Sequence, residues 1–139
     1  MSGHFFFKER WFGFDDGIYA GARLLEYLSK QPSLERAFKG LPKSVSTPEL
    51  QIQCAEGENF SLTEKLKTSD CFSTAVEKIT MDGIRVEYQD GFGLARASNT
   101  TPSIVLRFEA DTQAALKRII NEFQSAIVEV APHLSFPKG

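Results

Sequence analysis

The residues of this chain best suited to chemistry lie in one short segment, residues 96–102. Arg96 carries a planar guanidinium that binds two oxygen atoms of an anion such as phosphate at once. Ser98, Asn99 and Thr100 add neutral hydrogen-bond donors, and a tight turn would point successive backbone N–H groups into one concave nest. The segment therefore predicts a phosphate-binding loop.

An ordinary turn accounts for the same residue types. Ser, Asn, Thr and Pro are common in turns that join two antiparallel strands, whether or not the turn binds a ligand. No Asp or Glu occurs between Asp90 and Glu109, so no acid within this stretch of sequence repels an anion. On residue types alone, both interpretations stay open.

The composition limits the class of protein. A chain of 139 residues with 42% hydrophobic and 24% charged residues has the size and balance of a globular domain with its own core. The net charge of −2 argues against general binding to nucleic acid or to a membrane surface. No apolar run approaches the roughly 20 residues that a membrane span needs. Cys54 and Cys71 match neither a disulfide framework nor a metal site, which predicts free cysteines in a reducing cytoplasm.

Alternating apolar residues predict the strands that must position the loop. These patterns occur at 50–54, 84–88, 92–97 and 104–108, and a further strand ends near Met81. The Asp82-Gly83 pair is a strong hairpin signal. The predicted fold class is α+β, with an antiparallel sheet of four strands, or five strand segments if 84–88 and 92–97 pair separately, covered by two helices.

Helical periodicity predicts the remaining elements. Residues 18–28 form a helix after a cap at Asp15 or Asp16, and residues 58–69 can form a modest one. The strongest pattern predicts a last helix capped by Asp111, and its apolar stripe is Leu116, Ile119, Ile120, Phe123, Ile127 and Val130. Residues 4–11, which are rich in aromatic side chains, are interpreted as a buried strand.

Several blocks of the sequence resemble one known family. The run Gly91-Phe92-Gly93-Leu94-Ala95-Arg96-Ala97-Ser98-Asn99-Thr100-Thr101-Pro102 is similar to the phosphate loop of the α-D-phosphohexomutases, in their bacterial phosphomannomutase/phosphoglucomutase branch. Residues 1–4 and 7–19 resemble another segment of the same family. With 46–49 and 107–112, the similarity extends over nearly the whole chain.

The resemblance implies a domain organisation. Residues 49–139 would be the C-terminal phosphate-binding domain, with a topology like that of the TATA-box-binding protein. Residues 1–40 would be a strand–helix remnant of the third, α/β domain with part of its sugar-binding loop, and 41–48 a linker or hinge. Members of the family are four-domain enzymes, and their nucleophile and metal loops have no counterpart in this sequence. We therefore expect a C-terminal fragment that is inactive by itself.

The resemblance also implies an activity. The family interconverts hexose 1-phosphate and hexose 6-phosphate through a phosphoserine and a 1,6-bisphosphate intermediate. Ser2 would contact sugar hydroxyls, and His4 would act as a general acid or base in the intact enzyme. The residues that would bind the substrate phosphate are Arg96, Ser98, Asn99 and Thr100.

Cofactor and partners follow from the same resemblance. The intact enzyme would use Mg²⁺ held by ligands outside this chain, and no residue here is assigned to a metal. The partners would be mannose or glucose phosphates and the N-terminal domains of the same polypeptide, with no nucleic acid and no membrane. A stand-alone module that binds a phosphorylated ligand or a protein partner remains the alternative.

Overall fold

The structure, a computed structural model, describes residues 3–137. The chain divides into two compact units, which we call unit 1 (residues 1–42) and unit 2 (residues 43–139). The boundary falls between Pro42 and Lys43, inside the segment 41–48 that the sequence predicts as a linker.

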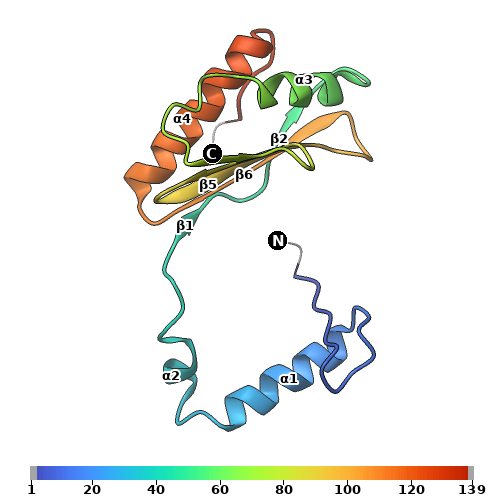
Figure 1. The fold of residues 1–139 in the computed structure, drawn as a ribbon, viewed down its shortest axis with the longest axis vertical. Coiled ribbons are helices and arrows are strands. Elements are labelled where there is room, and N and C mark those ends of the chain that lie inside the picture. The colour runs from blue at the N-terminus through green and yellow to red at the C-terminus, as the bar shows by residue number, and fades with distance from the viewer. Residues whose placement is uncertain (1–2, 138–139) are drawn as a thin grey trace. The chain divides into compact units, whose positions relative to one another are not determined.

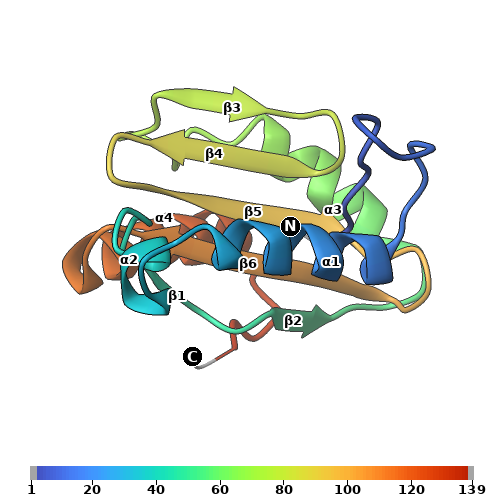
Figure 2. The ribbon, with the colours of Figure 1, turned by 90° about the horizontal axis from the view of Figure 1, so that it is seen from below.

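Unit 2 is built on a single antiparallel sheet (Figure 2). Its strands are β1 (Val45–Ser46), β2 (Leu50–Gln53), β3 (Glu77–Ile79), β4 (Ile84–Tyr88), β5 (Gly91–Ala97) and β6 (Ser103–Ala110). The order across the sheet is β1-β6-β5-β4-β3, and β2 also pairs with β6. The two central strands, β5 and β6, pair from Gly91 opposite Ala110 to Ala97 opposite Ile104.

Within residues 3–137 the sheet has six strands, one more than the higher of the two predicted counts. The segments 84–88 and 91–97 are separate strands that pair with each other, with Tyr88 opposite Gly91 and Ile84 opposite Ala95. Strand β1 was not predicted, because two residues are too few to show an alternating pattern. It pairs with the end of β6, so the sheet of unit 2 begins within the segment predicted as a linker.

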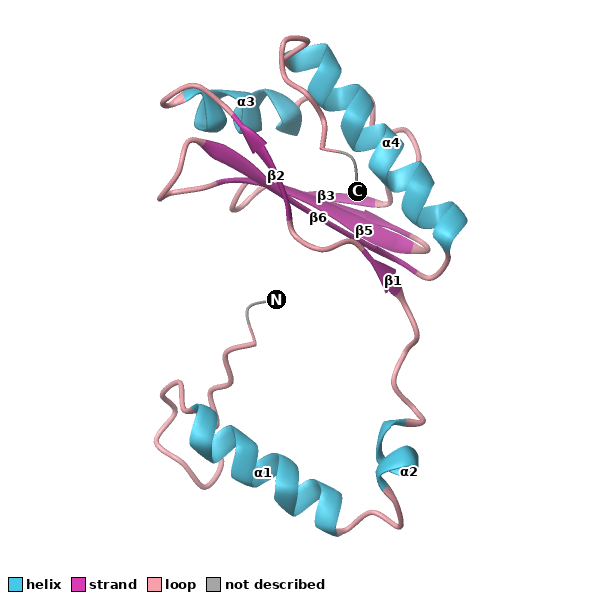
Figure 3. Cartoon of the chain, turned by 180° about the vertical axis from the view of Figure 1, so that it is seen from behind, coloured by secondary structure: helices cyan, strands magenta, loops and turns pink. Residues whose placement is uncertain are grey.

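Two helices, α3 (Glu58–Lys67) and α4 (Gln113–Val130), cover one face of this sheet (Figures 1 and 3). The apolar stripe predicted for the last helix faces the sheet, and Ile119 and Phe123 have no exposed surface. Strand β6 alternates in the same way, with every second side chain from Ile104 to Ala110 buried. This buried layer is the core that positions the strands and their connecting loops. The α+β fold class is confirmed.

The helix cap predicted at Asp111 is wrong by one residue. Helix α4 begins after Thr112, whose side chain accepts a hydrogen bond from Ala115 N at 3.2 Å. Asp and Thr are both good N-caps, so neighbouring candidates cannot be separated by residue type. The backbone of Asp111 belongs to the end of the sheet, because Asp111 N donates to Asp90 O at 2.9 Å. The helix therefore begins one residue later.

Unit 1 holds helix α1 (Gly17–Ser29) and the short α2 (Leu34–Phe38). Asp16 caps α1 by accepting from Tyr19 N at 2.9 Å, one of the two caps predicted. The strand predicted at 4–11 is wrong, since those residues contribute only an isolated bridge between Phe6 and Asp15. A strand needs a neighbour for its backbone groups, and the described part of unit 1 offers none. Neither helix has a buried residue, and Phe5 is 58% exposed.

An ion pair between Arg10 and Glu26 joins the segment before α1 to that helix, which predicts a defined acid response. Hydrogen bonds from Arg10, and then from Lys30, lower the pKa of the Glu26 carboxyl to about 2 from its ordinary value of 4.5. A lowered carboxyl pKa stabilises the fold above the ordinary value, and this stabilisation is lost as the pH falls through the lowered one. We therefore expect the Arg10–Glu26 pair to persist at pH 4.5 and to break near pH 2. Carboxyl ¹³C NMR of Glu26 measures this directly.

The matched control for this titration is Arg10→Ala, which removes the first cause of the shift. Its Glu26 carboxyl should titrate closer to 4.5 than that of the unchanged chain. Equal titration curves for the two proteins would contradict the expected role of Arg10.

Candidate functional site

The 96–102 loop connects the two central strands of unit 2. Arg96 is the second-last residue of β5 and pairs with Val105 of β6. Its neighbour Ala95 is fully buried beneath the helices, and side chains alternate along a strand. Arg96 therefore projects from the opposite, uncovered face of the sheet, next to the turn formed by residues 98–102.

The Ser98 hydroxyl closes this turn. Its Oγ accepts hydrogen bonds from Thr100 N at 3.3 Å, Thr101 N at 3.2 Å and Thr101 Oγ1 at 2.9 Å. A serine hydroxyl carries one hydrogen in addition to its acceptor positions. The Ser98 oxygen therefore holds the turn together, and the hydroxyl has one hydrogen left to donate to a ligand. The sequence predicted only the donor role.

The outward-pointing donors are those of Arg96, Asn99 and Thr100, the other three residues predicted to bind the phosphate. The Arg96 side chain is 50% exposed, and Asn99 and Thr100 are both exposed. Within residues 3–137, the Asn99 side chain has no hydrogen-bond partner, and Thr100 Oγ1 makes only a long 3.4 Å contact with Ser98 Oγ. These groups can reorient toward an anion without breaking strong bonds.

An acidic side chain lies beside Arg96, although the surrounding sequence contains none. Arg96 Nη1 donates to Asp82 Oδ2 at 3.4 Å, because the β3–β4 turn brings Asp82 next to the end of β5. Gly83 permits that approach: its φ is +76°, and a Cβ there would lie 2.3 Å from Ala95 O. The Arg96–Asp82 pair is long and exposed, so it is a weak competitor for an incoming phosphate.

Two small hollows flank the loop. The first, about 180 Å³, lies between the turn and the start of α3, and its lining includes Glu56, Asn59 and Phe60. The second, about 170 Å³, lies toward the β3–β4 turn and is lined in part by Asp82 and Asn99. Both are polar, as an anion site requires, but the first has one carboxylate in its lining and the second has two, Glu64 and Asp82.

Sequence reasoning missed two residues that act on the loop. One is Asp82, 14 residues before Arg96. The other is Asn59, whose Nδ2 lies 2.9 Å from Ser98 O across 39 residues of sequence. No local pattern could have indicated either contact, since both depend on the packing of the sheet and of α3.

The predicted sugar-side residues belong to unit 1. His4 Nδ1 is paired with the Asp15 carboxylate, and both side chains are exposed. A carboxylate partner orients an imidazole ring and fixes which nitrogen carries the proton. Ser2 lies outside the described residues.

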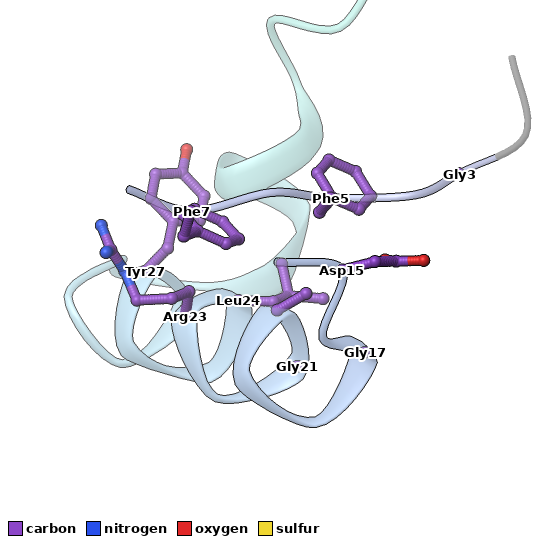
Figure 4. A pocket seen from close by; sticks show the side chains of 10 residues that line it. Gly3, Phe5, Phe7, Asp15, Gly17, Gly21, Arg23, Leu24 and Tyr27 are labelled. Carbon is purple, nitrogen blue, oxygen red and sulfur yellow. The ribbon is translucent and has the colours of Figure 1, made fainter. Parts of the chain in front are cut away.

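A larger cavity lies in unit 1. It has a volume of about 590 Å³ and an apolar lining that comes from residues before α1 and from α1 itself (Figure 4). Figure 4 shows Phe5 and Phe7 on one side of it and Leu24 on the other. Among the described residues, the one cationic side chain in its lining is Arg23, which is paired with Glu9 at 2.7 Å. The described lining therefore has no unpaired positive charge to bind an anion.

No group of three or more His, Cys, Asp or Glu side chains in residues 3–137 is arranged to hold a metal ion. None of the helices described there combines the length and the apolar character needed to cross a membrane.

By its fold, unit 2 is an α+β domain, and its β5–β6 hairpin presents Arg96 and a turn rich in hydroxyl side chains. Residues 49–126 match the family model described as "Phosphoglucomutase/phosphomannomutase, C-terminal domain". The chain belongs to this family.

Individual relatives agree with this assignment. The chain is 60% identical over 138 residues to a phosphoglucomutase of Neisseria gonorrhoeae and 53% identical to a phosphomannomutase/phosphoglucomutase of Pseudomonas syringae. A crystal structure of a phosphoglucomutase/phosphomannomutase family protein from Burkholderia thailandensis matches with a TM-score of 0.90 and 53% identity over 99% of this chain. The chain spans 30% of the length of the two curated relatives and 29% of the crystallised protein.

Proposed function

We propose that unit 2 binds the phosphate group of a hexose phosphate through the 96–102 loop. The observation that carries this proposal is the set of donors at the end of the β5–β6 hairpin. Arg96 supplies a bidentate cation, Asn99 and Thr100 supply outward donors, and Ser98 holds the turn and offers one hydrogen. Charge-assisted bonds are roughly twice as strong as neutral ones, so Arg96 contributes most.

We further propose that the longer protein containing this chain interconverts hexose 1-phosphate and hexose 6-phosphate. A phosphoserine outside this chain would transfer its phosphoryl group to the free hydroxyl at the other end of the substrate, giving a 1,6-bisphosphate. The bisphosphate would turn over and return the other phosphoryl group to the serine. The loop holds the phosphate that is not reacting, and such positioning contributes up to about 7–11 kcal/mol in the best systems. This chain alone is expected to be inactive.

The residues of unit 1 have a place in the same proposal. His4, oriented by Asp15, would donate or accept a proton near the transferring phosphoryl group. Ser2, by the family resemblance, would contact sugar hydroxyls. The exposed apolar face around Phe5 and Leu24 would be covered by other parts of the longer polypeptide, since a soluble domain rarely leaves such a face open to water.

We propose that the Mg²⁺ of the longer protein is held by ligands outside this chain. Residues 3–137 contain no group of three or more His, Cys, Asp or Glu side chains that could hold it. We also propose a cytoplasmic location, which is supported by the free thiols of Cys54 and Cys71. Binding to nucleic acid is disfavoured, because acids such as Glu87 and Glu109 alternate with the arginines on the uncovered sheet face.

An amide NMR titration of the 139-residue chain with glucose 1-phosphate tests the loop assignment. We expect saturable shifts confined to residues 96–101 and a dissociation constant that is roughly millimolar, near −4 kcal/mol. Unmodified glucose, the matched control, should produce no shifts there. Saturable shifts centred on other residues, or equal shifts with glucose, would contradict the assignment.

A further inference from the structure

We infer that Asn59, in the first turn of α3, is a positioning residue for the 96–102 loop. Its side-chain amide holds the backbone of the loop in the shape that presents Arg96, Asn99 and Thr100 to a phosphate. The inference rests on the proposed function, because it assigns this side chain a part in phosphate binding rather than in folding alone.

The contacts of the Asn59 amide span the turn. Nδ2 lies 2.9 Å from Ser98 O, 3.5 Å from Thr101 O and 3.3 Å from Ser103 O. One NH₂ group thus donates to the residue that starts the turn, to its far side and to the first residue of β6. Among the described residues, Asn59 is the one side chain outside the β5–β6 hairpin that donates to this turn.

The orientation of the amide is fixed by its surroundings. Asn59 is 2% exposed, and its Oδ1 is buried without a hydrogen-bond partner in the described chain. Exchanging Oδ1 and Nδ2 would direct an acceptor at three carbonyl oxygens, so only the observed orientation gives favourable contacts. A buried amide that leaves its own oxygen unpaired is used here as a donor only.

The loop needs this contact because its internal bonds do not attach it to the helix layer. Ser98 Oγ closes the turn upon itself, and Ser98 N donates to Ser103 O within the same hairpin at 2.9 Å. The backbone bond from Cys54 N to Pro102 O at 2.8 Å attaches only the final residue of the turn. Asn59 attaches the start of the turn, at Ser98, and its far side, at Thr101, to α3.

Helix α3 is itself a firm support. Leu62 and Leu66 of this helix are buried in the core, at 3% and 0% exposure. The Glu58 carboxylate accepts from Ala55 N at 2.8 Å, which fixes the approach to the first turn of the helix. The position of Asn59 is therefore set by packing, and the loop follows it.

The test compares Asn59→Asp with Thr63→Val in the 139-residue chain. Asp has the shape of Asn but offers no N–H donor, so the three carbonyls lose their partner and meet a carboxylate. Thr63 is buried one helical turn later, donates to Asn59 O at 2.7 Å and makes no hydrogen bond to the loop within the described residues. Both variants remove buried hydrogen bonding, but only the first changes the loop contact.

Two measurements separate positioning from general structure. Without ligand, amide hydrogen exchange and ¹⁵N relaxation should show increased motion at residues 98–101 in Asn59→Asp, while α4 keeps its protection. With glucose 1-phosphate, Asn59→Asp should bind roughly tenfold more weakly than the unchanged chain. Thr63→Val should match the unchanged chain in both measurements.

The inference would be overturned if Asn59→Asp and Thr63→Val showed the same loop motion and the same affinity for glucose 1-phosphate. Loss of protection in α4 together with the loop would also overturn it, since the role would then be structural. If Asn59→Asp does not fold, Asn59→Ala removes the donor without adding a charge and is judged by the same criteria. If the unchanged chain does not bind glucose 1-phosphate, the proposed function fails, and the ligand-free measurement still decides whether Asn59 orders the loop.

Discussion

Replacing Arg96 with Ala is expected to weaken glucose 1-phosphate binding by roughly 10- to 100-fold, the range of about 1.5–3 kcal/mol for hydrogen bonds to charged groups. Arg96 is the one cation within the loop, and its half-exposed guanidinium is free to turn toward an anion. NMR titration of the variant measures the change in dissociation constant. Lys117→Ala is the matched control, because it removes one exposed positive charge from α4, on the other side of the sheet.

Comparable weakening by Lys117→Ala would mean that overall charge, rather than the Arg96 contact, controls binding.

Replacing Asp82 with Asn tests the same contact from its acidic side. It removes the carboxylate that lies 3.4 Å from Arg96 Nη1, so binding should become tighter, by at most about fivefold, since exposed pairs contribute about 0–1 kcal/mol. Weaker binding in Asp82→Asn would show that Asp82 orients Arg96 instead of competing for it.

Replacing Phe123 with Ala is expected to lower the free energy of unfolding of unit 2 by about 3–5 kcal/mol. Its ring has no exposed surface and contacts Phe72 and Phe108, with centroids 4.8 Å and 5.2 Å away. It also lies against the backbone of Gly93, where a Cβ would fall 2.3 Å from Phe123 Cε2. Because small domains are stable by only about 5–15 kcal/mol, this loss is a large fraction of the total.

Urea unfolding followed by the amide signals of β5 and β6 measures this loss for unit 2 alone. Phe60→Ala is the matched control: the same side chain is removed from α3, where it is 51% exposed. Its effect should remain within about 0.5 kcal/mol, as is usual for surface positions. Equal effects of the two substitutions would mean that Phe123 is not central to the core.

The elements that the sequence predicted well are those whose signal is local. Helix α4 has apolar residues at helical spacing over five turns, and tertiary packing agrees with that pattern. The hairpin at Asp82-Gly83 follows from the backbone freedom of glycine, and the observed φ of +76° at Gly83 requires it.

The predictions that failed depend on partners elsewhere in the chain. The aromatic run 4–11 has the composition of a strand, but a strand exists only where another strand pairs with it. The cap of α4 moved from Asp111 to Thr112 because the backbone of Asp111 is held by Asp90 O. Local residue types carry no information about either contact.

In the candidate site, too, the groups that are close in sequence were predicted and the contacts that depend on the fold were not. The donors Arg96, Asn99 and Thr100 lie within five residues, so the sequence alone places them together. The engagement of the Ser98 oxygen, the carboxylate of Asp82 and the amide of Asn59 are products of three-dimensional packing. The sequence thus indicates which groups are candidates for binding an anion, and the structure indicates which neighbouring groups orient them or compete for them.

The contact between Asn59 and Ser98 has a consequence for the order in which the domain folds. The two residues are 39 apart in sequence, and pairings across such separations form slowly because a long loop must close first. The turn can reach its final shape only after α3 has docked on the sheet. On heating, local opening at the start of α3 is therefore expected to weaken the proposed phosphate binding while the core around Phe108 is still folded.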